Sequence, residues 1–282
     1  MNKKIKIAAI LSCHNRKIKT MACLESLFSI IPDIDVYLTD DGCTDGTPEA
    51  ASSISENIHI VSGNGNLFWS RGMYKAWSEA VKGDYDYYLW LNDDVELYPT
   101  FLNELMECNC ESGKHCVIVG LIKNIETGEI LYGGTDKYGK LLQESDIPQS
   151  ITNMNGNVVL VPKSVVDEIG IIDPVYWHDI GDVDYGMMAT KAGIPVLSTR
   201  KAVADGHSNG KFCRVRKWGT TIENRFKKLY SPLGSNPNIS FYFFKKHKGI
   251  VKACSVYLYL HLINLMPDCM VKWIWGDKFI EA

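Results

Sequence analysis

The sequence lacks any apolar run long enough to cross a bilayer, since none reaches the roughly 18 uncharged apolar residues that a spanning helix needs. We also expect no export signal, because the first apolar run, residues 7–11, is followed at once by the polar residues 12–16. Internal repeats and low-complexity segments are missing as well. We therefore expect a cytoplasmic globular protein, with the inner face of the cell membrane as a possible peripheral location.

The sequence also lacks a large net charge of either sign and closely spaced cysteine pairs. The 30 Lys and Arg nearly balance the 33 Asp and Glu, for a formal net charge of -3, so the chain as a whole does not resemble a nucleic-acid binder. Its nine cysteines include no Cys-x-x-Cys pair, and Cys108, Cys110 and Cys116 do not form the two spaced pairs of a zinc site. We expect reduced, structural thiols.

The 282 residues, 46% of them hydrophobic, are enough for a sizeable core. Strands and helices are predicted to alternate, and the strands are unbroken apolar runs. This pattern indicates an α/β fold with a mostly parallel central sheet flanked by helices. The strands are expected at residues 5–11, 35–39, 58–61, 87–91, 117–122 and 158–161, and the helices at 20–31, 48–55, 73–81, 99–108, 163–169 and 183–192.

Polar clusters follow three of the predicted strands, at residues 12–16, 40–47 and 92–94. In an open parallel sheet, ligands bind beyond the carboxyl ends of the strands, so these clusters are expected to converge at one edge. The adjacent carboxylates of Asp93 and Asp94 repel each other unless a cation or several donors neutralise them. A hard cation that also binds a diphosphate would suit such a pair.

The ordered set of motifs resembles glycosyltransferase family 2, an inverting family with the GT-A fold. The family's strand followed by Asn-Arg matches residues 10–16, and its Asp-Asp-Gly-Ser-x-Asp-Gly-Thr matches residues 40–47, with Cys in place of Ser. Its Asp-x-Asp metal motif matches residues 92–94, with Asn first. The resemblance covers about residues 5–208. It implies a catalytic domain over residues 1–210, with a nucleotide-sugar half to about 98 and an acceptor half beyond it.

For the donor, the resemblance implies nucleobase contacts from Ser12 and Asp41, a ribose contact from Asp93, and a Mn²⁺ or Mg²⁺ ligand at Asp94. Further nucleotide candidates are Asn15 and Arg71, the latter in a Gly-rich segment that leads into a helix, where anions are favoured. Alternatives stay open for several neighbours. They are turn and cap roles for Asp40 and Asp45, pairing of Arg16 with nearby acids, and a core position for Trp69.

For catalysis, the family's Glu-Asp-x-Asp segment matches residues 181–184, with Gly181 in place of Glu. The Asp that follows is the family's general base, so the resemblance assigns this role to Asp182. A carboxylate within about 3 Å of a sugar hydroxyl can take its proton as the new bond forms. Stabilisation of the helix N-terminus is the alternative for both acids, and we prefer it for Asp184. Asp179, three residues before Asp182, is a competing base.

Other acceptor-side residues are implied by position in the same way. His207 matches the family's third metal contact, although a lone histidine is more often structural. The resemblance also suggests that the acceptor pocket is lined by Asn155, Gly156, Trp177 and His178.

The C-terminal residues 211–282 are expected to form a basic, aromatic-rich helical extension. Residues 200–252 hold thirteen Lys or Arg against two acids, and residues 250–275 have a helical apolar pattern broken at Pro267. For residues 211–252 we prefer a surface that contacts an anionic membrane, where a lipid-linked acceptor would lie. A solvated basic face and a nucleic-acid patch are the alternatives there, the latter without any recognisable binding module. For residues 250–275, a packed helix pair or a homodimer face stays open equally with contact at the membrane interface.

The sequence thus predicts a metal-dependent, inverting glycosyltransferase. Its donor would be a nucleoside diphosphate sugar, with UDP- or dTDP-sugars favoured, and its acceptor a hydroxyl of a glycan or lipid-linked glycan. Two alternatives remain: a catalytically silent sugar-nucleotide or glycan-binding protein, favoured only by Gly181, and a nucleotidyltransferase. The latter should carry a Gly-rich, basic loop directly after the first strand, where this chain has residues 12–15.

Overall fold

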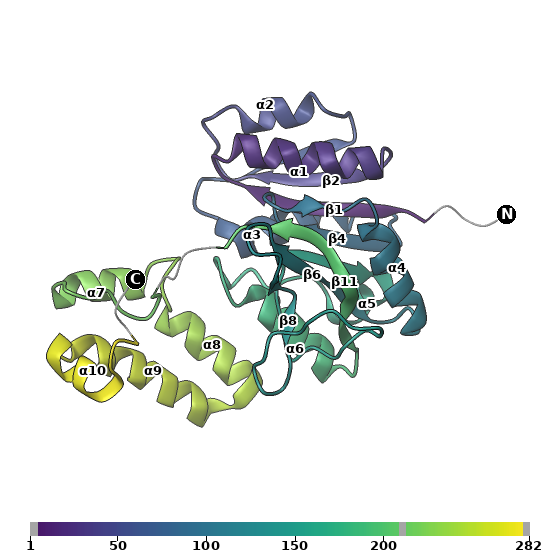
Figure 1. Ribbon diagram of the computed structural model, residues 1–282. Helices are drawn as coiled ribbons and strands as arrows, with labels where there is room; N and C mark the ends of the chain where they lie inside the picture. The colour runs from purple at the N-terminus through teal and green to yellow at the C-terminus, as the bar shows by residue number, and fades with distance from the viewer. Residues whose placement is uncertain (1–4, 209–212, 279–282) are drawn as a thin grey trace. The chain divides into compact units, whose positions relative to one another are not determined.

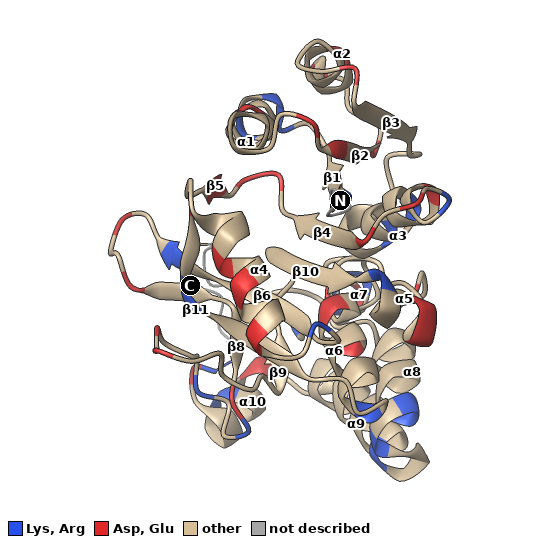
Figure 2. Ribbon diagram, turned by 90° about the vertical axis from the view of Figure 1, so that its right-hand side faces the viewer, with Lys and Arg blue, Asp and Glu red and all other residues tan. Residues whose placement is uncertain are grey.

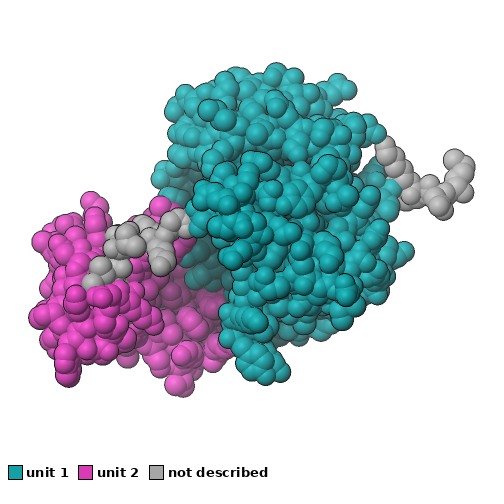
Figure 3. All heavy atoms as spheres, viewed as in Figure 1, with its two compact units in different colours: residues 1–208 teal, residues 209–282 magenta. Residues whose placement is uncertain are grey.

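The computed structural model describes residues 5–208 and 213–278 (Figure 1). It divides into two compact units, Met1–Ser208 (unit 1) and Asn209–Ala282 (unit 2), which are coloured separately in Figure 3. Unit 1 carries every strand, and unit 2 is helical in its described residues.

Unit 1 is built on a nine-stranded sheet. Its strands are β1 (Ile7–Cys13), β2 (Asp35–Asp40), β3 (Ile58–Ser62), β4 (Tyr87–Leu91), β5 (Glu96–Leu97), β6 (Val117–Asn124), β7 (Ile130–Tyr132), β10 (Val158–Pro162) and β11 (Val196–Gly206). Their order is β3-β2-β1-β4-β10-β6-β11-β5, with β7 paired to β6. The short strands β8 (Gly134–Thr135) and β9 (Asn153–Met154) form a separate pair.

The sheet is parallel in its N-terminal half and mixed beyond β4. Strands β3, β2, β1 and β4 are all parallel, whereas β10 runs antiparallel to both β4 and β6, and β6 is parallel to β11. The sequence predicted a mostly parallel sheet. Unbroken apolar strands indicate burial on both faces, which is typical of parallel sheets, but burial does not fix the direction of any single strand. The antiparallel direction of β10 could therefore not be predicted from its apolar residues.

Helices cover both faces of the sheet, as the unbroken apolar strands predicted (Figure 1). One face packs against α1 (Lys17–Ile30), α2 (Thr47–Ser52) and α4 (Phe101–Glu111), and the other against α3 (Phe68–Ala80), α5 (Lys163–Ile169) and α6 (Gly181–Lys191). Successive residues of β1 point to opposite faces, so Ala9 belongs to the first core and Ala8 to the second.

Several elements differ from the sequence-based expectation, among them α3 and β11. Helix α3 begins at Phe68, five residues earlier than predicted, because the Asp41 carboxylate accepts the backbone N–H groups of Leu67 and Phe68. Strand β11 was not predicted at all. Its polar middle, residues 199–201, interrupts the apolar pattern of a strand.

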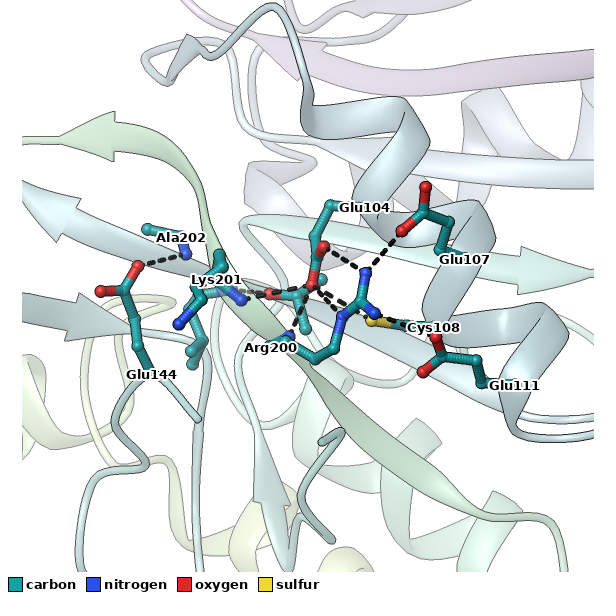
Figure 4. A network of polar contacts seen from close by, with 10 residues as sticks. Glu104, Glu107, Cys108, Glu111, Glu144, Arg200, Lys201 and Ala202 are labelled. Carbon is teal, nitrogen blue, oxygen red and sulfur yellow. Dashed lines mark hydrogen bonds and ion pairs between the residues drawn. The ribbon is translucent and has the colours of Figure 1, made fainter. Parts of the chain in front are cut away.

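The polar middle of β11 is explained by an ion-pair network with α4 (Figure 4). The Arg200 guanidinium contacts Glu104 at 2.8 Å, Glu107 at 2.6 Å and Glu111 at 2.9 Å. Burial alone would raise the pKa of Glu104, but hydrogen bonds from Arg200 outweigh it and hold that pKa at about 2. Arg200 therefore fastens α4 to the sheet.

Unit 2 contains α7 (Ile222–Leu229), α8 (Pro237–Lys248), α9 (Ile250–Leu265) and α10 (Asp268–Trp275), with the break near Pro267 that the sequence indicated. Two of its arginines are internal. Arg216 is fully buried and bonds the Met266 carbonyl at 3.0 Å, while Arg225 bonds the same carbonyl at 2.8 Å and pairs with Asp268 at 2.9 Å. Guanidinium groups at the C-terminus of α9 satisfy its last carbonyls. None of the described helices is both long and apolar enough to span a bilayer.

Candidate active site

The polar segments that follow β1, β2 and β4 lie at one edge of the sheet, because β1 pairs in parallel with both β2 and β4. The first two segments meet where the Thr44 N–H donates to Asn15 Oδ1 at 2.7 Å. The first and third meet where Arg16 pairs with Asp93 at 3.0 Å. The structure therefore brings the three polar clusters together.

Asp40 and Asp45 brace the turn after β2. Oδ1 of Asp40 accepts the Cys43 N–H at 2.7 Å. Asp45 accepts the N–H of Lys17 at 2.9 Å and of Thr47 at 3.1 Å, and these are the first residues of α1 and α2. The side chains thus take the turn and cap roles that were left open from the sequence.

Asp41 is buried and organises the Gly-rich loop before α3. Its carboxylate accepts the N–H groups of Gly65 at 2.8 Å, Leu67 at 2.9 Å and Phe68 at 3.0 Å. A Cβ on Gly63 would lie 2.8 Å from the Asp40 carbonyl oxygen, so only glycine lets the loop come this close. The residue predicted to contact the nucleobase therefore also shapes the adjacent loop.

Ser12, at the end of β1, lies against the first turn of α3. A Cβ on Gly72 would fall 2.0 Å from Ser12 Oγ, and the Thr39 hydroxyl donates to the Gly72 carbonyl at 2.8 Å. Glycine at position 72 is therefore what allows the N-terminus of α3 to approach the ends of β1 and β2.

The adjacent carboxylates after β4 are neutralised from within the chain. Arg16 pairs with Asp93 at 3.0 Å and also with Asp94, and the Thr20 hydroxyl donates to Asp93 at 3.0 Å. Burial raises the pKa of Asp93 to about 6, even though the Arg16 charge opposes this. Thr20 and Arg16 were not among the predicted site residues, although Arg16 was expected to pair with nearby acids.

The predicted metal ligands are Asp94, whose side chain is 20% exposed, and His207, which is exposed directly after β11. Within residues 5–208 and 213–278, no group of three or more His, Cys, Asp or Glu side chains could hold a metal ion. A carboxylate oxygen suits Mg²⁺ and Mn²⁺, which usually complete their coordination with water and substrate phosphates. The residues present therefore fit a cation that arrives with a diphosphate, and they do not form a closed protein cage.

Asn92, the first residue of the motif at residues 92–94, links the two halves of unit 1. The Trp69 indole donates to Asn92 Oδ1 at 2.8 Å, and the Asn92 N–H donates to the Asn157 carbonyl at 2.8 Å. The Asn92 amide also contacts the Asn157 side chain. Trp69 thus packs against the core and also bonds Asn92, and Asn92 connects α3 with the predicted acceptor segment.

Asp182 lies in the first turn of α6, half-buried, with both carboxylate oxygens oriented by backbone groups. Gly156 N–H donates to one oxygen at 3.0 Å and Val183 N–H to the other at 2.8 Å. Burial raises the pKa of Asp182 while these two N–H groups oppose the shift. A carboxylate with a raised pKa is a better proton acceptor at neutral pH. Asp184 is fully buried, and its carboxylate accepts a hydrogen bond from the Tyr176 hydroxyl at 2.7 Å.

Gly181 is explained by packing between α3 and α6. A Cβ at this position would lie 2.4 Å from Ser70 Oγ and 3.1 Å from Ile172 Cδ1, so the family's Glu has no room here. The preceding residue, Ile180, has φ 72, which is costly for a β-branched side chain. The sequence did not single out Ser70, whose backbone N–H also donates to the Trp177 carbonyl at 3.0 Å.

Arg71, predicted for the donor, lies beside residues predicted for the acceptor. Its Nε donates to the Pro174 carbonyl at 3.0 Å, and its guanidinium is 4.7 Å from the centre of the Trp177 ring. The rings of Phe68 and His178 are 6.4 Å apart. The start of α3 and the loop before α6 thus form one surface.

Two predicted acceptor residues hold buried polar atoms that find no hydrogen-bond partner among the described residues, namely Asn155 Oδ1 and Trp177 Nε1. Buried polar atoms are usually paired, so an unpaired acceptor and donor call for explanation. Asn155 precedes Gly156, which bonds Asp182, and Trp177 stacks with Arg71. A ligand rich in hydroxyl groups could satisfy both atoms.

Comparison with known proteins places these features in a family. Residues 8–170 match the model of glycosyl transferase family 2. A curated relative, the N-acetylglucosaminyl-diphospho-decaprenol L-rhamnosyltransferase of Mycobacterium tuberculosis, is 24% identical over 213 residues, which cover 63% of this chain and 69% of the relative.

Solved structures show the same GT-A fold. TarS from S. aureus has a TM-score of 0.58 and 12% identity over 92% of this chain, which spans only 43% of TarS. The mannosyltransferase PcManGT from Pyrobaculum calidifontis, solved with GDP-Man and Mn²⁺, has a TM-score of 0.56 and 10% identity, covering 98% of this chain and 80% of that one. The predicted GT-A fold is therefore confirmed.

Proposed function

Since this chain belongs to glycosyl transferase family 2, we propose that it transfers a sugar, with inversion, from a nucleoside diphosphate sugar to a hydroxyl of a glycan or lipid-linked glycan. The observation that carries the proposal is the Asp182 carboxylate, oriented by Gly156 and Val183 and raised in pKa by burial. The name of the curated relative, which describes a rhamnosyltransferase acting on a decaprenol-linked sugar, supports a lipid-linked acceptor.

In this proposal Asp182 is the general base. A sugar hydroxyl is a weak nucleophile, and its attack is favoured if a carboxylate accepts the proton as the bond to the anomeric carbon forms. The two backbone N–H groups fix the direction of the carboxylate. Asn155 Oδ1 and Trp177 Nε1 would bond hydroxyl groups of the acceptor, together with His178 nearby. Attack opposite the diphosphate inverts the configuration.

On the donor side, Asp93 would bond the ribose, Ser12 and Asp41 the base, and Arg71 the base or a phosphate. Among the described residues, Oδ1 of Asp41 accepts one N–H, so it retains capacity for the ring N–H of a nucleobase. Uracil, thymine and guanine all carry such a group, and within this set we propose a UDP- or dTDP-sugar. Asn15 acts through the turn that it braces.

We further propose that Asp94 and His207 hold a Mn²⁺ or Mg²⁺ ion together with the donor. When bound, the ion would neutralise charge that develops on the leaving diphosphate. Gly181, the only sequence feature that favoured a silent binding protein, is accounted for by its contact with Ser70.

Thermal shift with a panel of UDP-, dTDP- and GDP-sugars, each with and without Mn²⁺, tests the proposal. A true donor at a hundred times its dissociation constant should add about 2.7 kcal/mol to the free energy of unfolding. We expect one nucleotide class to raise the melting temperature, and to do so more with Mn²⁺. No shift with any nucleotide would contradict it.

A further inference from the structure

Unit 2 exposes far more apolar surface than unit 1. Of the eighteen large hydrophobic side chains that are exposed among the described residues, twelve belong to unit 2. Among these twelve, Trp273 is the most exposed, at 87%, followed by Val251 at 77%. Scattered exposed apolar residues are normal, but a concentration in one small unit marks an interaction surface.

Most of these side chains lie on α9 and α10. The spacing along α9 is three or four residues, which places the side chains on one face of the helix. The opposite face of α9, with Ala253, Leu260 and Ile263, is buried within unit 2. We define the apolar stripe as Val251, Cys254, Leu258, Leu262 and Leu265 on α9 with Met270, Trp273 and Ile274 on α10, all exposed.

The charges along α8 and α9 have one sign. No acidic residue occurs between Glu223 and Asp268, so α8 and α9 contain none. Lysines gather where α8 ends and α9 begins, at Lys245, Lys248 and Lys252, and Figure 2 shows these positions in blue. The whole of unit 2 has thirteen Lys and Arg against four Asp and Glu.

We propose that the apolar stripe docks unit 2 onto the surface of an anionic lipid bilayer. The stripe would enter the boundary between headgroups and acyl chains, and the lysines would contact lipid phosphates. Trp273 has the amphipathic ring that favours this boundary. The absence of acids matches a negatively charged surface, whereas a protein partner would place no such restriction on the whole of α8 and α9. This inference does not depend on the transfer reaction.

Co-sedimentation of the full chain with lipid vesicles tests this docking proposal. One set of vesicles is pure phosphatidylcholine, and the other contains one third phosphatidylglycerol, an anionic lipid. We expect binding to the anionic vesicles that weakens as salt screens the lysines. Lys248→Glu with Lys252→Glu should weaken binding at least about tenfold, and Trp273→Ser with Leu262→Gln by a similar factor. The matched controls are Lys114→Glu with Lys191→Glu and Tyr138→Ser, which change exposed residues of unit 1.

Two outcomes would overturn the proposal. One is equal sedimentation of the wild type with and without anionic vesicles. The other is that the apolar stripe joins two copies of the chain instead. Sedimentation velocity would then show a dimer for the wild type and a monomer for Trp273→Ser with Leu262→Gln. The same double variant would bind vesicles as the wild type does. Circular dichroism of each variant confirms that loss of binding is not loss of folding.

Discussion

The backbone N–H of Gly156 donates to Oδ2 of Asp182 at 3.0 Å, which joins the acceptor segment to the first turn of α6. We predict that Asp182→Asn keeps the fold and lowers the transfer rate by about 10²- to 10⁴-fold, because the amide cannot accept the proton. Initial rates of sugar transfer measure this. The control is Asp179→Asn, which removes the competing carboxyl and should leave most activity. Near-normal rates for Asp182→Asn would remove the assignment.

The acidic limb of the pH–rate profile should report the same group. Burial raises the pKa of Asp182, so its carboxyl keeps its proton to a higher pH than an exposed aspartate. The base is active only when deprotonated, so kcat should fall as the pH decreases through this raised pKa, by about tenfold per pH unit below it. An acidic limb at the pH of an ordinary aspartate, or below it, would contradict the prediction.

Restoring a side chain at position 181 should destabilise the protein. The new Cβ of Gly181→Ala would lie 2.4 Å from Ser70 Oγ, and overpacking of this kind typically costs about 1–3 kcal/mol in the free energy of unfolding. Adding Ser70→Gly should recover part of that loss, so the two substitutions should not be additive. Urea unfolding of the single and double variants gives the coupling. Full additivity would show that the two residues do not compete for space.

Arg16 should compete with a divalent cation for Asp94. We predict that Arg16→Gln binds Mn²⁺ about tenfold more tightly in the absence of nucleotide, because the substitution removes the positive charge that now neutralises Asp93 and Asp94. Electron paramagnetic resonance of free Mn²⁺ during titration measures the affinity. Lys19→Gln removes the same charge from an exposed position and is the control. Unchanged or weaker Mn²⁺ binding in Arg16→Gln would refute this competition.

The network in Figure 4 predicts a pH-dependent stability. The folded-state pKa of Glu104 is about 2, below its ordinary value. Its stabilisation is therefore complete above the unfolded pKa and is lost as the pH falls from about 4.5 toward about 2. Glu104→Gln should cost about 2–3 kcal/mol at neutral pH and nothing at the acidic end.

Glu107 offers a matched control for that measurement. It contacts the same guanidinium at 2.6 Å but its side chain is 62% exposed, so Glu107→Gln should cost about 1 kcal/mol or less. Urea unfolding at several pH values compares the two variants. Equal losses for both would mean that burial of Glu104 is not what strengthens its ion pair.

The order of motifs along the chain was sufficient to identify the family and its fold. Local signals placed the buried strands and most helices, because apolar periodicity depends on residues that are near in sequence. The same signals missed β11, since Thr199, Arg200 and Lys201 are polar. They are accommodated in a strand because each finds a polar partner nearby. The Thr199 hydroxyl accepts the Leu121 N–H at 2.9 Å, and Arg200 pairs with Glu104 of α4.

The sequence by itself predicted which residues carry the chemistry, because the types and order of side chains suffice for such a prediction. The tertiary structure decided what each side chain touches. Arg16 and Asp94 are 78 residues apart in the chain, and only the parallel pairing of β1 with β4 brings them into contact. Likewise, the absence of a side chain at Gly181 could be understood only from its distance to Ser70. Contacts between distant segments follow from the register of strands and the packing of helices, which local sequence does not encode.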